Sequence, residues 1–482
     1  MTAPFARKRL QAIAQRGQVH VFDPRRTETA QVATAHHAIR PGTDALALLA
    51  LLHVVFAEGA PKLGHLADGA AHLDRLQAWA ADFPPERVAG ATGVPADTLR
   101  ALARRLLETP RAAVYGRMGA CTQAFGGVTA MLLYALNAVT GHLDTPGGLM
   151  FAEPAVAAVH PPFGRPGAAR NRFGRWHSRV RGLPEFFGEL PVATLAEDIL
   201  APGDDATRGL VLWAGNPVLS CPNGRRLDEA LTGLDFMVAV DLYRTETNRH
   251  AHLLLPAAPP LSRDHYDLAF NLLAVRNHAK FAPAVLPAPD ETRQDWQIAH
   301  GLQRRLEARA GASLAQRAAT AALGRLGPRG VLDLALRAGP YGARTGLKGL
   351  ALGRLKANPH GVDLGALRPC LRRRMAKGWP GVDLCPDTFA DEHARLSAAL
   401  DAPAEGLVLI GRRLLRSNNS WLHNSPRLLK GKDRCTVLIH PEDAAARGIE
   451  EGAAVEIESR VGRVQAPAEL STEVMPGVVS LP

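Results

Sequence analysis

Three short apolar runs between residues 210 and 260 each stop at a polar residue or a proline. The runs and their stops are Leu210–Trp213 before Gly215-Asn216-Pro217, Phe236–Val240 before Asp241, and Leu253–Leu255 before Pro256. The intervening segment Gly224–Thr232 has a helical pattern. This order predicts a strand–loop–helix–strand unit with parallel strands. The carboxyl ends of such strands are where open α/β sheets bind ligands.

The amino-terminal part also alternates between helical and strand-like patterns, which predicts a parallel sheet with covering helices. Thr43 or Asp44 is the expected N-cap of the second helix. The predicted helices are Phe5–Arg16, Ala45–Ala57, Pro95–Leu107 and Val128–Val139, and the predicted strands are Gln18–Phe22 and Ala112–Tyr115.

The pattern changes to short alternating strands with Gly and Pro turns from Gly406 onward. One short helix, Pro441–Gly448, interrupts them. This pattern of short strands, turns and one helix predicts a small β-barrel domain. Its expected strands are Leu407–Ile410, Thr436–Ile439, Ala454–Ser459, Arg463–Glu469 and Val478–Leu481.

Less regular segments connect these parts. Leu302–Leu323 is predicted to be helical, Pro328–Met375 a helical and loop connection, Pro380–Pro386 a short strand and Ala402–Glu405 a linker. Phe151–Pro191 is rich in Pro, Gly, Arg and His without periodicity, which is typical of a cleft or lid but equally of a surface excursion between domains. We therefore expect four segments, 1–150, 151–300, 301–402 and 403–482.

Composition limits the classes of function. The chain has 482 residues, 57 Lys and Arg against 46 Asp and Glu, and a net charge of +11, which permits an anionic partner but also fits a generally basic surface. Without a compact basic run interleaved with aromatics, nucleic acid is a poor candidate partner. Five scattered cysteines without a CxxC pair offer no zinc or iron–sulfur ligand set and favour a reducing compartment. The amino terminus lacks a signal-peptide pattern and Leu46–Ala57 is too short for a membrane span, so we expect a cytoplasmic location.

Several polar residues stand where strands end. Asp23 and Asp241 have threonines nearby (Thr27 and Thr245 among them) and could accept hydrogen bonds from a nucleotide, although turn formation would also explain them. Asn216 resembles a phosphate-facing turn, and Gly116–Gly119 with Gln123 forms a small-residue loop that suits an anion or a planar ring. A cluster of arginines and asparagines after the first barrel strand (Arg412, Arg413, Arg416, Ser417, Asn418, Asn419 and Asn424) favours a ligand-facing loop over a solvated surface.

The histidines indicate a metal site only weakly. His250 and His252 lie two apart and His36 and His37 are adjacent, but no third ligand follows with metal-site spacing. We therefore predict structural roles for them and no protein-ligated metal.

Eight segments, in order along nearly the whole chain, resemble the molybdopterin-dinucleotide oxidoreductases, the family of formate dehydrogenases, nitrate reductases and dimethyl sulfoxide reductases. The matching segments are Asp23–Ala30, Arg40–Asp44, Gly116–Gln123, Leu136–Gly148, Trp213–Asn223, Val240–Pro256, Arg416–Asn424 and His440–Gly462.

The resemblance implies an α/β fold with Rossmann-like parallel-sheet domains and a carboxyl-terminal double-psi β-barrel. It also implies a molybdenum (or tungsten) bis-molybdopterin guanine dinucleotide cofactor. Residues that the family places near guanosine, pterin or diphosphate correspond here to Asp23, Arg25, Thr27, Gly42, Thr43, Asp44, Gly116, Met118, Gly119, Gln123, Gly215, Asn216, Pro217, Asp241, Thr245, Arg413, Arg416, Ser417, Asn418 and Asn424.

Two features depart from the family pattern. The 22 residues before Asp23 contain no Cys, Ser or Asp, so the metal ligand and the cysteines of a 4Fe-4S cluster are expected upstream of Met1. The chain is thus interpreted as a fragment that holds the cofactor and has little turnover alone.

The resemblance also implies two-electron chemistry on a small anionic substrate such as formate or nitrate. An electron-transfer subunit or redox partner is expected with it. Arg170 and His177, with His160, Arg165 and Arg179, are candidates for a substrate funnel, although they also fit a surface loop. The alternative is a non-catalytic fragment or subunit that only binds a dinucleotide.

Overall fold

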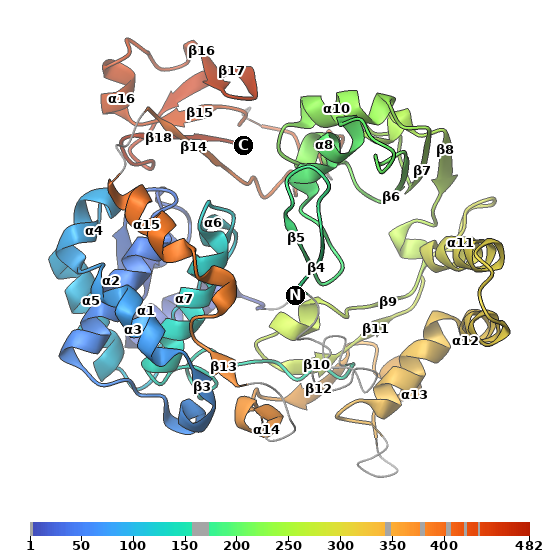
Figure 1. The fold of residues 1–482 in the computed structure, drawn as a ribbon, viewed down its shortest axis with the longest axis horizontal. Helices are drawn as coiled ribbons and strands as arrows, with labels where there is room; N and C mark the ends of the chain where they lie inside the picture. Colours follow the sequence, from blue (N-terminus) through green and yellow to red (C-terminus); the bar gives the residue numbers. More distant parts are fainter. Residues whose placement is uncertain are drawn as a thin grey trace. The chain divides into compact units, whose positions relative to one another are not determined.

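The computed structural model describes residues 3–156, 173–342, 349–375, 381–401, 406–418, 422–431 and 434–482. The chain divides into two compact units (Figure 1). Unit 1 is formed by residues 152–367. Unit 2 is formed by residues 3–151 together with 368–482.

Unit 2 begins with a helical cluster around α2 (Asp44–Glu58), which contacts α3 (Leu73–Ala81), α4 (Pro85–Thr92), α5 (Ala96–Glu108) and α7 (Gly126–Val139) (Figure 1). Ten of the fifteen residues of α2 are buried, Leu49 and Leu52 completely, as expected of a helix that is apolar on most sides. The predicted helices at 5–16, 45–57, 95–107 and 128–139 are confirmed to within two residues at each end, the first of them as α1 (Ala6–Arg16).

The parallel sheet of the first 150 residues is smaller than predicted. β1 (His20–Phe22) pairs in parallel with β2 (Ala35–His37), and the predicted strand Ala112–Tyr115 does not form. Val114 of this segment instead bonds to the side chain of buried Asn137 on α7. The Asn137 amide accepts from Val114 N at 3.0 Å and donates to Val114 O at 2.7 Å. The segment is therefore attached to a helix rather than to a neighbouring strand.

The returning segment 368–401 completes this core. β13 (Val382–Asp383) pairs in parallel with β3 (Ala70–Ala71), in agreement with the strand predicted near residue 383. Leu384, Cys385 and Leu396 are buried in the same cluster as α2. The short helices here are α14 (Leu371–Met375) and α15 (Glu392–Asp401).

The carboxyl-terminal part of unit 2 is a five-stranded sheet that curls into a half-barrel, so the small barrel-like domain is confirmed in its coarse form (Figure 1). The strand order is β14-β18-β15-β17-β16, with parallel pairs β14–β18 and β15–β17 and antiparallel pairs β15–β18 and β16–β17. The strands are β14 (Val408–Gly411), β15 (Val437–Ile439), β16 (Ala454–Ser459), β17 (Gly462–Leu470) and β18 (Val478–Leu481). The predicted helix at 441–448 ends earlier, as α16 (Pro441–Ala445).

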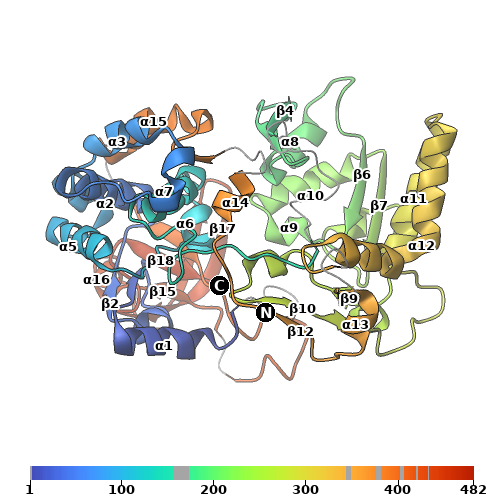
Figure 2. The same cartoon turned by 90° about the horizontal axis from the view of Figure 1, so that it is seen from below.

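Unit 1 contains the strand–helix–strand unit expected from the apolar runs. β6 (Gly209–Trp213), β7 (Phe236–Asp241) and β8 (Leu253–Pro256) form a parallel sheet in that order, beside α10 (Gly224–Thr232) (Figure 2). Leu227 and Leu231 of α10 pack with Met237 of β7 and with α8 (Leu195–Leu200). All four predicted elements of this region are confirmed.

The segment Phe151–Pro191 is more regular than its composition indicates, because an antiparallel hairpin joins β4 (Phe173–His177) to β5 (Pro184–Phe186). Gly182 takes a positive φ of 64° in its turn, a conformation that glycine adopts readily. Arg170 lies outside the described residues.

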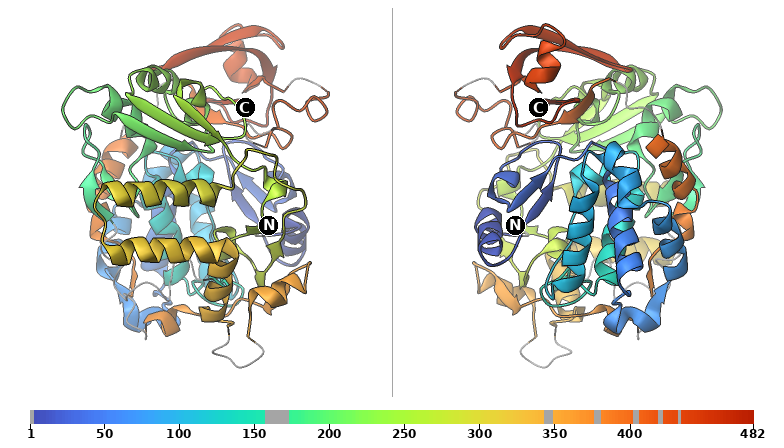
Figure 3. Two further views of the ribbon diagram at one scale, coloured as in Figure 1. Left: turned by 90° about the vertical axis from the view of Figure 1, so that its right-hand side faces the viewer. Right: turned by 90° about the vertical axis from the view of Figure 1, so that its left-hand side faces the viewer.

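The rest of unit 1 is a helical pair with small sheets. α11 (Asp295–Arg309) and α12 (Leu314–Ala338) lie side by side (Figure 3, left), so the single helix predicted at 302–323 is wrong. The break contains Gly311 at a φ of 67°, and Ser313 and Gln316 form a capping box at the start of α12. The other elements are α13 (Leu352–Lys356) and the antiparallel pairs β9 (His265–Tyr266) with β11 (Phe281–Ala282) and β10 (Asn277–Ala279) with β12 (Val362–Gly365).

Candidate functional site

Two aspartates of unit 2 lie close enough to influence each other. Asp23 follows β1, where its Oδ1 accepts the N–H of Arg25 at 2.9 Å and its carbonyl contacts His36 Nε2 at 2.8 Å. Asp44 begins α2, and burial raises the pKa of its carboxyl to about 6, with the charge of Asp23 adding to the rise. Burial likewise raises the pKa of Asp23. Two adjacent, partly buried carboxyls with raised pKa values are typical of a ligand site.

The loop before α2 approaches the loop that leads into α7. Gly42 has a φ of 85°, and a Cβ placed on it would lie 3.9 Å from Oε1 of Gln123. Gln123 Nε2 donates in turn to the carbonyl of Gly119 at 3.1 Å, and Thr43 Oγ1 donates to the carbonyl of Arg40 at 2.7 Å. Two predicted segments that are 70 residues or more apart in the sequence are therefore neighbours in unit 2.

The glycines of the second loop have different surroundings. A Cβ on Gly116 would come within 2.6 Å of Leu133 Cδ1, so this glycine permits close packing against α7. A Cβ on Gly119 would meet nothing within 4 Å, and Met118 beside it is 54% exposed on the short helix α6 (Met118–Cys121). The open side of the loop is thus at Met118 and Gly119.

The segment after β1 also contacts the half-barrel. Arg25 and Val474 pair as an isolated antiparallel β-bridge. On either side of it, Arg26 N donates to Glu473 O at 2.6 Å and Met475 N donates to Pro24 O at 3.0 Å. The guanidinium of Arg25 is 4.0 Å from the carboxylate of Glu473. Thr27 Oγ1 accepts the N–H of Ala30 at 3.3 Å, which closes the turn.

The arginine-rich loop after β14 has one buried donor without a partner. Nη2 of Arg412 donates to the carbonyls of Thr436 and Arg434 at 2.8 and 3.1 Å, but its Nε has no hydrogen-bond partner. Burial lowers the pKa of Arg412, and the positive charge of Arg25 acts in the same direction. An anion beside these guanidiniums would accept a hydrogen bond from the unpartnered Nε and would offset the cost of burying the positive charge.

Five other residues predicted in this loop have less specific surroundings, and Asn419 lies outside the described residues. Arg413 and Asn424 are exposed, and Asn418 takes a φ of 42°. Arg416 Nη1 donates to the carbonyl of Lys430 at 2.8 Å, and Ser417 Oγ donates to that of Leu414 at 3.1 Å. In this structure Arg416 and Ser417 maintain the loop.

In unit 1 the loop after β6 is tied to the segment after β7. Asn216 Nδ2 donates to Glu246 at 2.8 Å, and buried Thr247 donates to Asn216 Oδ1 at 2.7 Å and accepts the N–H of Val218 at 3.0 Å. The Asn216 hydrogen bond lowers the pKa of Glu246. Gly215 precedes this amide, and Pro217 begins the one-turn helix α9 (Pro217–Ser220).

Asp241 ends β7 and receives two bonds from its own segment. Its Oδ1 accepts the N–H of Leu242 at 2.7 Å and its Oδ2 accepts Asn248 Nδ2 at 3.2 Å. Buried Asn248 also accepts the N–H of Thr245 at 2.6 Å and donates to Tyr243 O at 2.7 Å. Sequence reasoning missed Asn248 and Glu246, although the polar run after a buried strand was a signal for them.

The histidines each contact a neighbour that explains their position. His250 Nε2 lies 2.6 Å from Asp228, and His252 Nδ1 accepts the N–H of Met237 at 3.0 Å. His20 Nδ1 and His37 Nε2 are 3.0 Å apart across β1 and β2. Within the described ranges no three His, Cys, Asp or Glu side chains come close enough to hold a metal ion.

Of the predicted funnel residues, His177 and Arg179 lie within the described residues, whereas His160, Arg165 and Arg170 lie outside them. His177 ends β4, opposite Pro184, and is exposed. Arg179 is engaged with Asp205 at 2.7 Å and with the carbonyl of Ala201 at 2.8 Å.

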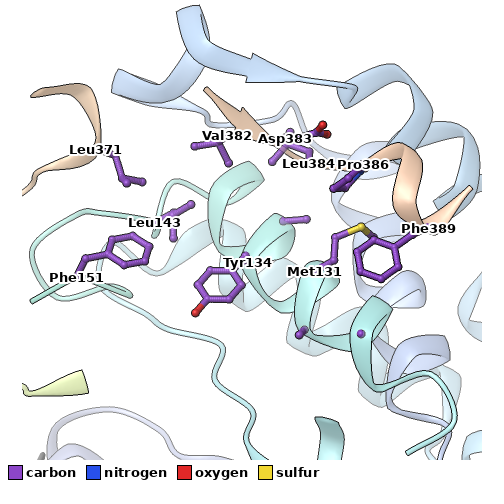
Figure 4. Close-up of a pocket in the computed structure, with 13 residues that line it drawn as sticks. Met131, Tyr134, Leu143, Phe151, Leu371, Val382, Asp383, Leu384, Pro386 and Phe389 are labelled. Carbon is purple, nitrogen blue, oxygen red and sulfur yellow. The ribbon is translucent and has the colours of Figure 1, made fainter. Parts of the chain in front are cut away.

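Unit 2 also has an apolar cavity of about 450 Å³ beside α7 (Figure 4). Met131, Tyr134, Phe151 and Phe389 are among its lining side chains, and Asp383 is the charged residue among them. None of the predicted site residues lines this cavity.

Two family models match the chain. Residues 2–305 match the family model described as molybdopterin oxidoreductase, and residues 407–482 match the molydopterin dinucleotide binding domain. The chain therefore belongs to the molybdopterin oxidoreductase family, and the resemblance noted in the sequence is confirmed.

Among the curated relatives that match most of the chain are a formate dehydrogenase subunit and a nitrate reductase subunit. The chain is 24% identical to the F420-dependent formate dehydrogenase 2 subunit alpha of Methanococcus maripaludis, over 96% of this chain and 66% of that protein. It is 24% identical to the assimilatory nitrate reductase catalytic subunit of Bacillus subtilis, over 96% and 65%. The chain thus spans just under two thirds of the length of these relatives.

Solved structures share the fold, and one of them is acetylene hydratase. Acetylene hydratase from Pelobacter acetylenicus superposes with a TM-score of 0.73 at 17% identity, covering 98% of this chain and 68% of that one. No helix in the part of the chain that the structure describes is long and apolar enough to cross a membrane.

Proposed function

We propose that this chain supplies the cofactor-binding part of a molybdopterin oxidoreductase that transfers two electrons to or from a small anionic substrate such as formate or nitrate. The observation that carries the proposal is the pair Asp23 and Asp44, brought together in unit 2 with raised pKa values. The names of two relatives, a formate dehydrogenase and a nitrate reductase, support the substrate class.

Each unit offers hydrogen-bond donors and acceptors that fit a guanine dinucleotide. Carboxylates accept hydrogen bonds from the N–H groups of a guanine edge, and Asp23, Asp44 and Asp241 offer such carboxylates. The unpartnered Nε of buried Arg412, beside Arg25, suits a diphosphate oxygen. Asn216, held by Thr247, and the open loop at Met118 and Gly119 would face the pterin or diphosphate.

These residues would bind and orient the cofactor and exclude water. The molybdenum or tungsten pterin group supplies, when bound, the centre at which the two electrons are exchanged. The proposal includes a 4Fe-4S cluster in the full-length protein, ligated outside this chain, and an electron-transfer partner. Two relatives are named as the alpha subunit and the catalytic subunit of their enzymes.

The proposal also extends to the finer fold. The β6–β7–β8 sheet with α10 would be half of a Rossmann-like domain, and the half-barrel would be part of a double-psi barrel. The mixture of parallel and antiparallel neighbours in the half-barrel supports the latter assignment.

The test is the content and activity of the purified protein. We expect molybdenum or tungsten by elemental analysis, guanine dinucleotide by mass spectrometry, and reduction of a dye by formate or oxidation of a reduced dye by nitrate. Asp44→Asn should lower the dinucleotide content, whereas replacing exposed Asp68 by Asn should not. Bound dinucleotide with neither reaction would favour a non-catalytic binding subunit, and protein free of pterin would contradict the proposal.

A further inference from the structure

The side chain of Asn216 does not cap the helix that it begins. Asn216 is the N-cap residue of α9, a position where an asparagine oxygen usually accepts an N–H of the first turn, but its side chain makes no such bond here. The hydroxyl of Thr247, in the segment after β7, instead accepts the N–H of Val218 at 3.0 Å. The Asn216 side chain is therefore released from its usual local role.

Two neighbours determine which way the Asn216 amide is turned. Because Val218 N can only donate, Thr247 Oγ1 accepts that bond, and its single proton goes to Asn216 Oδ1, 2.7 Å away. On the other side, Asn216 Nδ2 donates to Glu246 Oε2 at 2.8 Å. The opposite orientation would place the amide oxygen against a carboxylate oxygen, and both atoms are acceptors. Glu246 and Thr247 together therefore hold one orientation of the amide.

The oriented amide keeps hydrogen-bonding capacity for a ligand. An asparagine side chain has two N–H donors and two lone pairs on its oxygen, and the bonds to Glu246 and Thr247 use one of each. Within the described part of the chain this amide has no further partner, and Asn216 is only half-buried. Ala214, just before it, takes a left-handed φ of 47°, a conformation that disfavours side chains and is retained where the surroundings fix the backbone.

The two residues that orient the amide differ in burial. Thr247 is fully buried and also caps α9, so replacing it would disturb the fold together with the amide. Glu246 is exposed, and its side chain bonds to Asn216. A carboxylate beside a group that faces a diphosphate would by itself repel the ligand. Any benefit of Glu246 to binding must therefore come from the orientation that it imposes on Asn216.

We propose that Glu246 is a positioning residue for the dinucleotide, an assignment that rests on the proposed function. Its carboxylate fixes the amide of Asn216 so that the second N–H of Nδ2 points to an acceptor oxygen of the pterin or the diphosphate. Without an acceptor at position 246, Thr247 alone holds the amide through one bond, and the direction of the second N–H is no longer fixed.

The test compares Glu246→Gln with Glu246→Ala in the full chain purified from its native host. Both substitutions remove the same charge, but glutamine keeps an oxygen that can accept from Asn216 Nδ2. The matched control is Glu229→Ala, at an exposed glutamate of α10 in the same unit. Bound guanine dinucleotide is quantified by mass spectrometry, and its release is followed during dialysis. Thermal unfolding of the cofactor-free forms shows whether the fold is unchanged.

We expect Glu246→Ala to release the dinucleotide about three- to tenfold faster than wild type, because one hydrogen bond of ordinary strength is lost. Glu246→Gln and Glu229→Ala should release it at the wild-type rate, and all cofactor-free forms should unfold within about 2 °C of wild type. In an Asn216→Ala background, Glu246→Ala should have no further effect, since the amide through which it acts is absent.

Three results would overturn the assignment of Glu246 alone. They are equal release from the glutamine and alanine variants, faster release that comes with a matching loss of thermal stability, and an effect of Glu246→Ala that persists without Asn216. Absence of guanine dinucleotide from wild type and from every variant would instead overturn the proposed function, and the assignment of Glu246 with it.

Discussion

The Asp44 carboxyl lies where burial disfavours its charge, and its pKa of about 6 has a consequence for stability. An acid whose pKa is raised by folding stabilises the folded state below its unfolded pKa, and this contribution is lost as the pH rises through the folded value. The loss therefore falls between about pH 4 and pH 6. A binding site that retains such a charge gives up stability for ligand affinity.

Asp44→Asn should therefore stabilise the cofactor-free protein at about pH 8 by roughly 1–2 kcal/mol, with a much smaller effect near pH 4. Urea denaturation at the two pH values measures the difference. Asp68→Asn, at an exposed position, is the control and should leave stability unchanged at both. An equal effect of Asp44→Asn at both pH values would show that its charge is not disfavoured.

In unit 1 the buried hydroxyl of Thr247 fixes the loop after β6. It donates to Asn216 Oδ1 and accepts the N–H of Val218. Thr247→Val keeps the shape and removes both bonds, and should cost about 1–3 kcal/mol. Thr247→Ser keeps the hydroxyl and should cost less. Thermal unfolding of the two variants tests this, and equal losses would mean that the methyl group matters more than the hydroxyl.

At the scale of elements, β1 and β2 are joined by a histidine pair that should respond to acid. His20 Nδ1 and His37 Nε2 are 3.0 Å apart, so one must donate and the other accept. Burial lowers both pKa values. The charge of Arg105 also acts on His20, and His20 and His36 act on His37. Lowered histidine pKa values mean that the fold favours the neutral rings, so stability falls as the pH drops below about 6.5.

His37→Gln retains a hydrogen-bonding side chain that does not titrate. We expect the wild-type protein to lose more stability than this variant between roughly pH 7.5 and pH 5.5. Denaturant unfolding at both values measures it. Parallel losses in the two proteins would place the acid-sensitive groups elsewhere.

Elements with strong local signals were predictable. Three strands and a helix formed as expected at 210–213, 236–240, 253–255 and 224–232. Hydrophobic periodicity and the polar or proline residues at their ends identify such elements without tertiary information. The strand at 112–115 failed because Asn137, more than 20 residues away, bonds to Val114. The break between α11 and α12 also has a local signal in the sequence, the capping box of Ser313 with Gln316.

At the scale of the whole molecule, unit 2 is assembled from two distant segments of the chain. Asp144 is one of the links. Its buried Oδ2 accepts the N–H groups of Cys370 and Leu371, both at 2.7 Å, and lies 3.4 Å from His65 Nε2. Its backbone takes a positive φ of 55°.

Asp144→Ala would leave two buried N–H groups without an acceptor and place alanine in a left-handed conformation, and should cost about 3 kcal/mol or more. Asp144→Asn keeps an acceptor oxygen and tolerates that conformation, so roughly half the loss is expected. Urea unfolding measures both values, and proteolysis within residues 368–401 should increase in the alanine variant. Equal stability of the alanine variant and wild type would show that other contacts join the segments.

The chain alone determined its family, because eight short motifs keep their order, and it determined the elements whose apolar period is strong. It also identified strand-end acids as candidate ligand groups. Only the tertiary structure decided that Asp23 and Asp44 are neighbours, that Gly42 meets Gln123, and that Arg412 has a buried donor without a partner. It also showed that Glu246 and Thr247 hold the amide of Asn216. The physical reason is that burial and charge interactions depend on which segments meet in space, and the periodicity of a single segment carries no record of its neighbours.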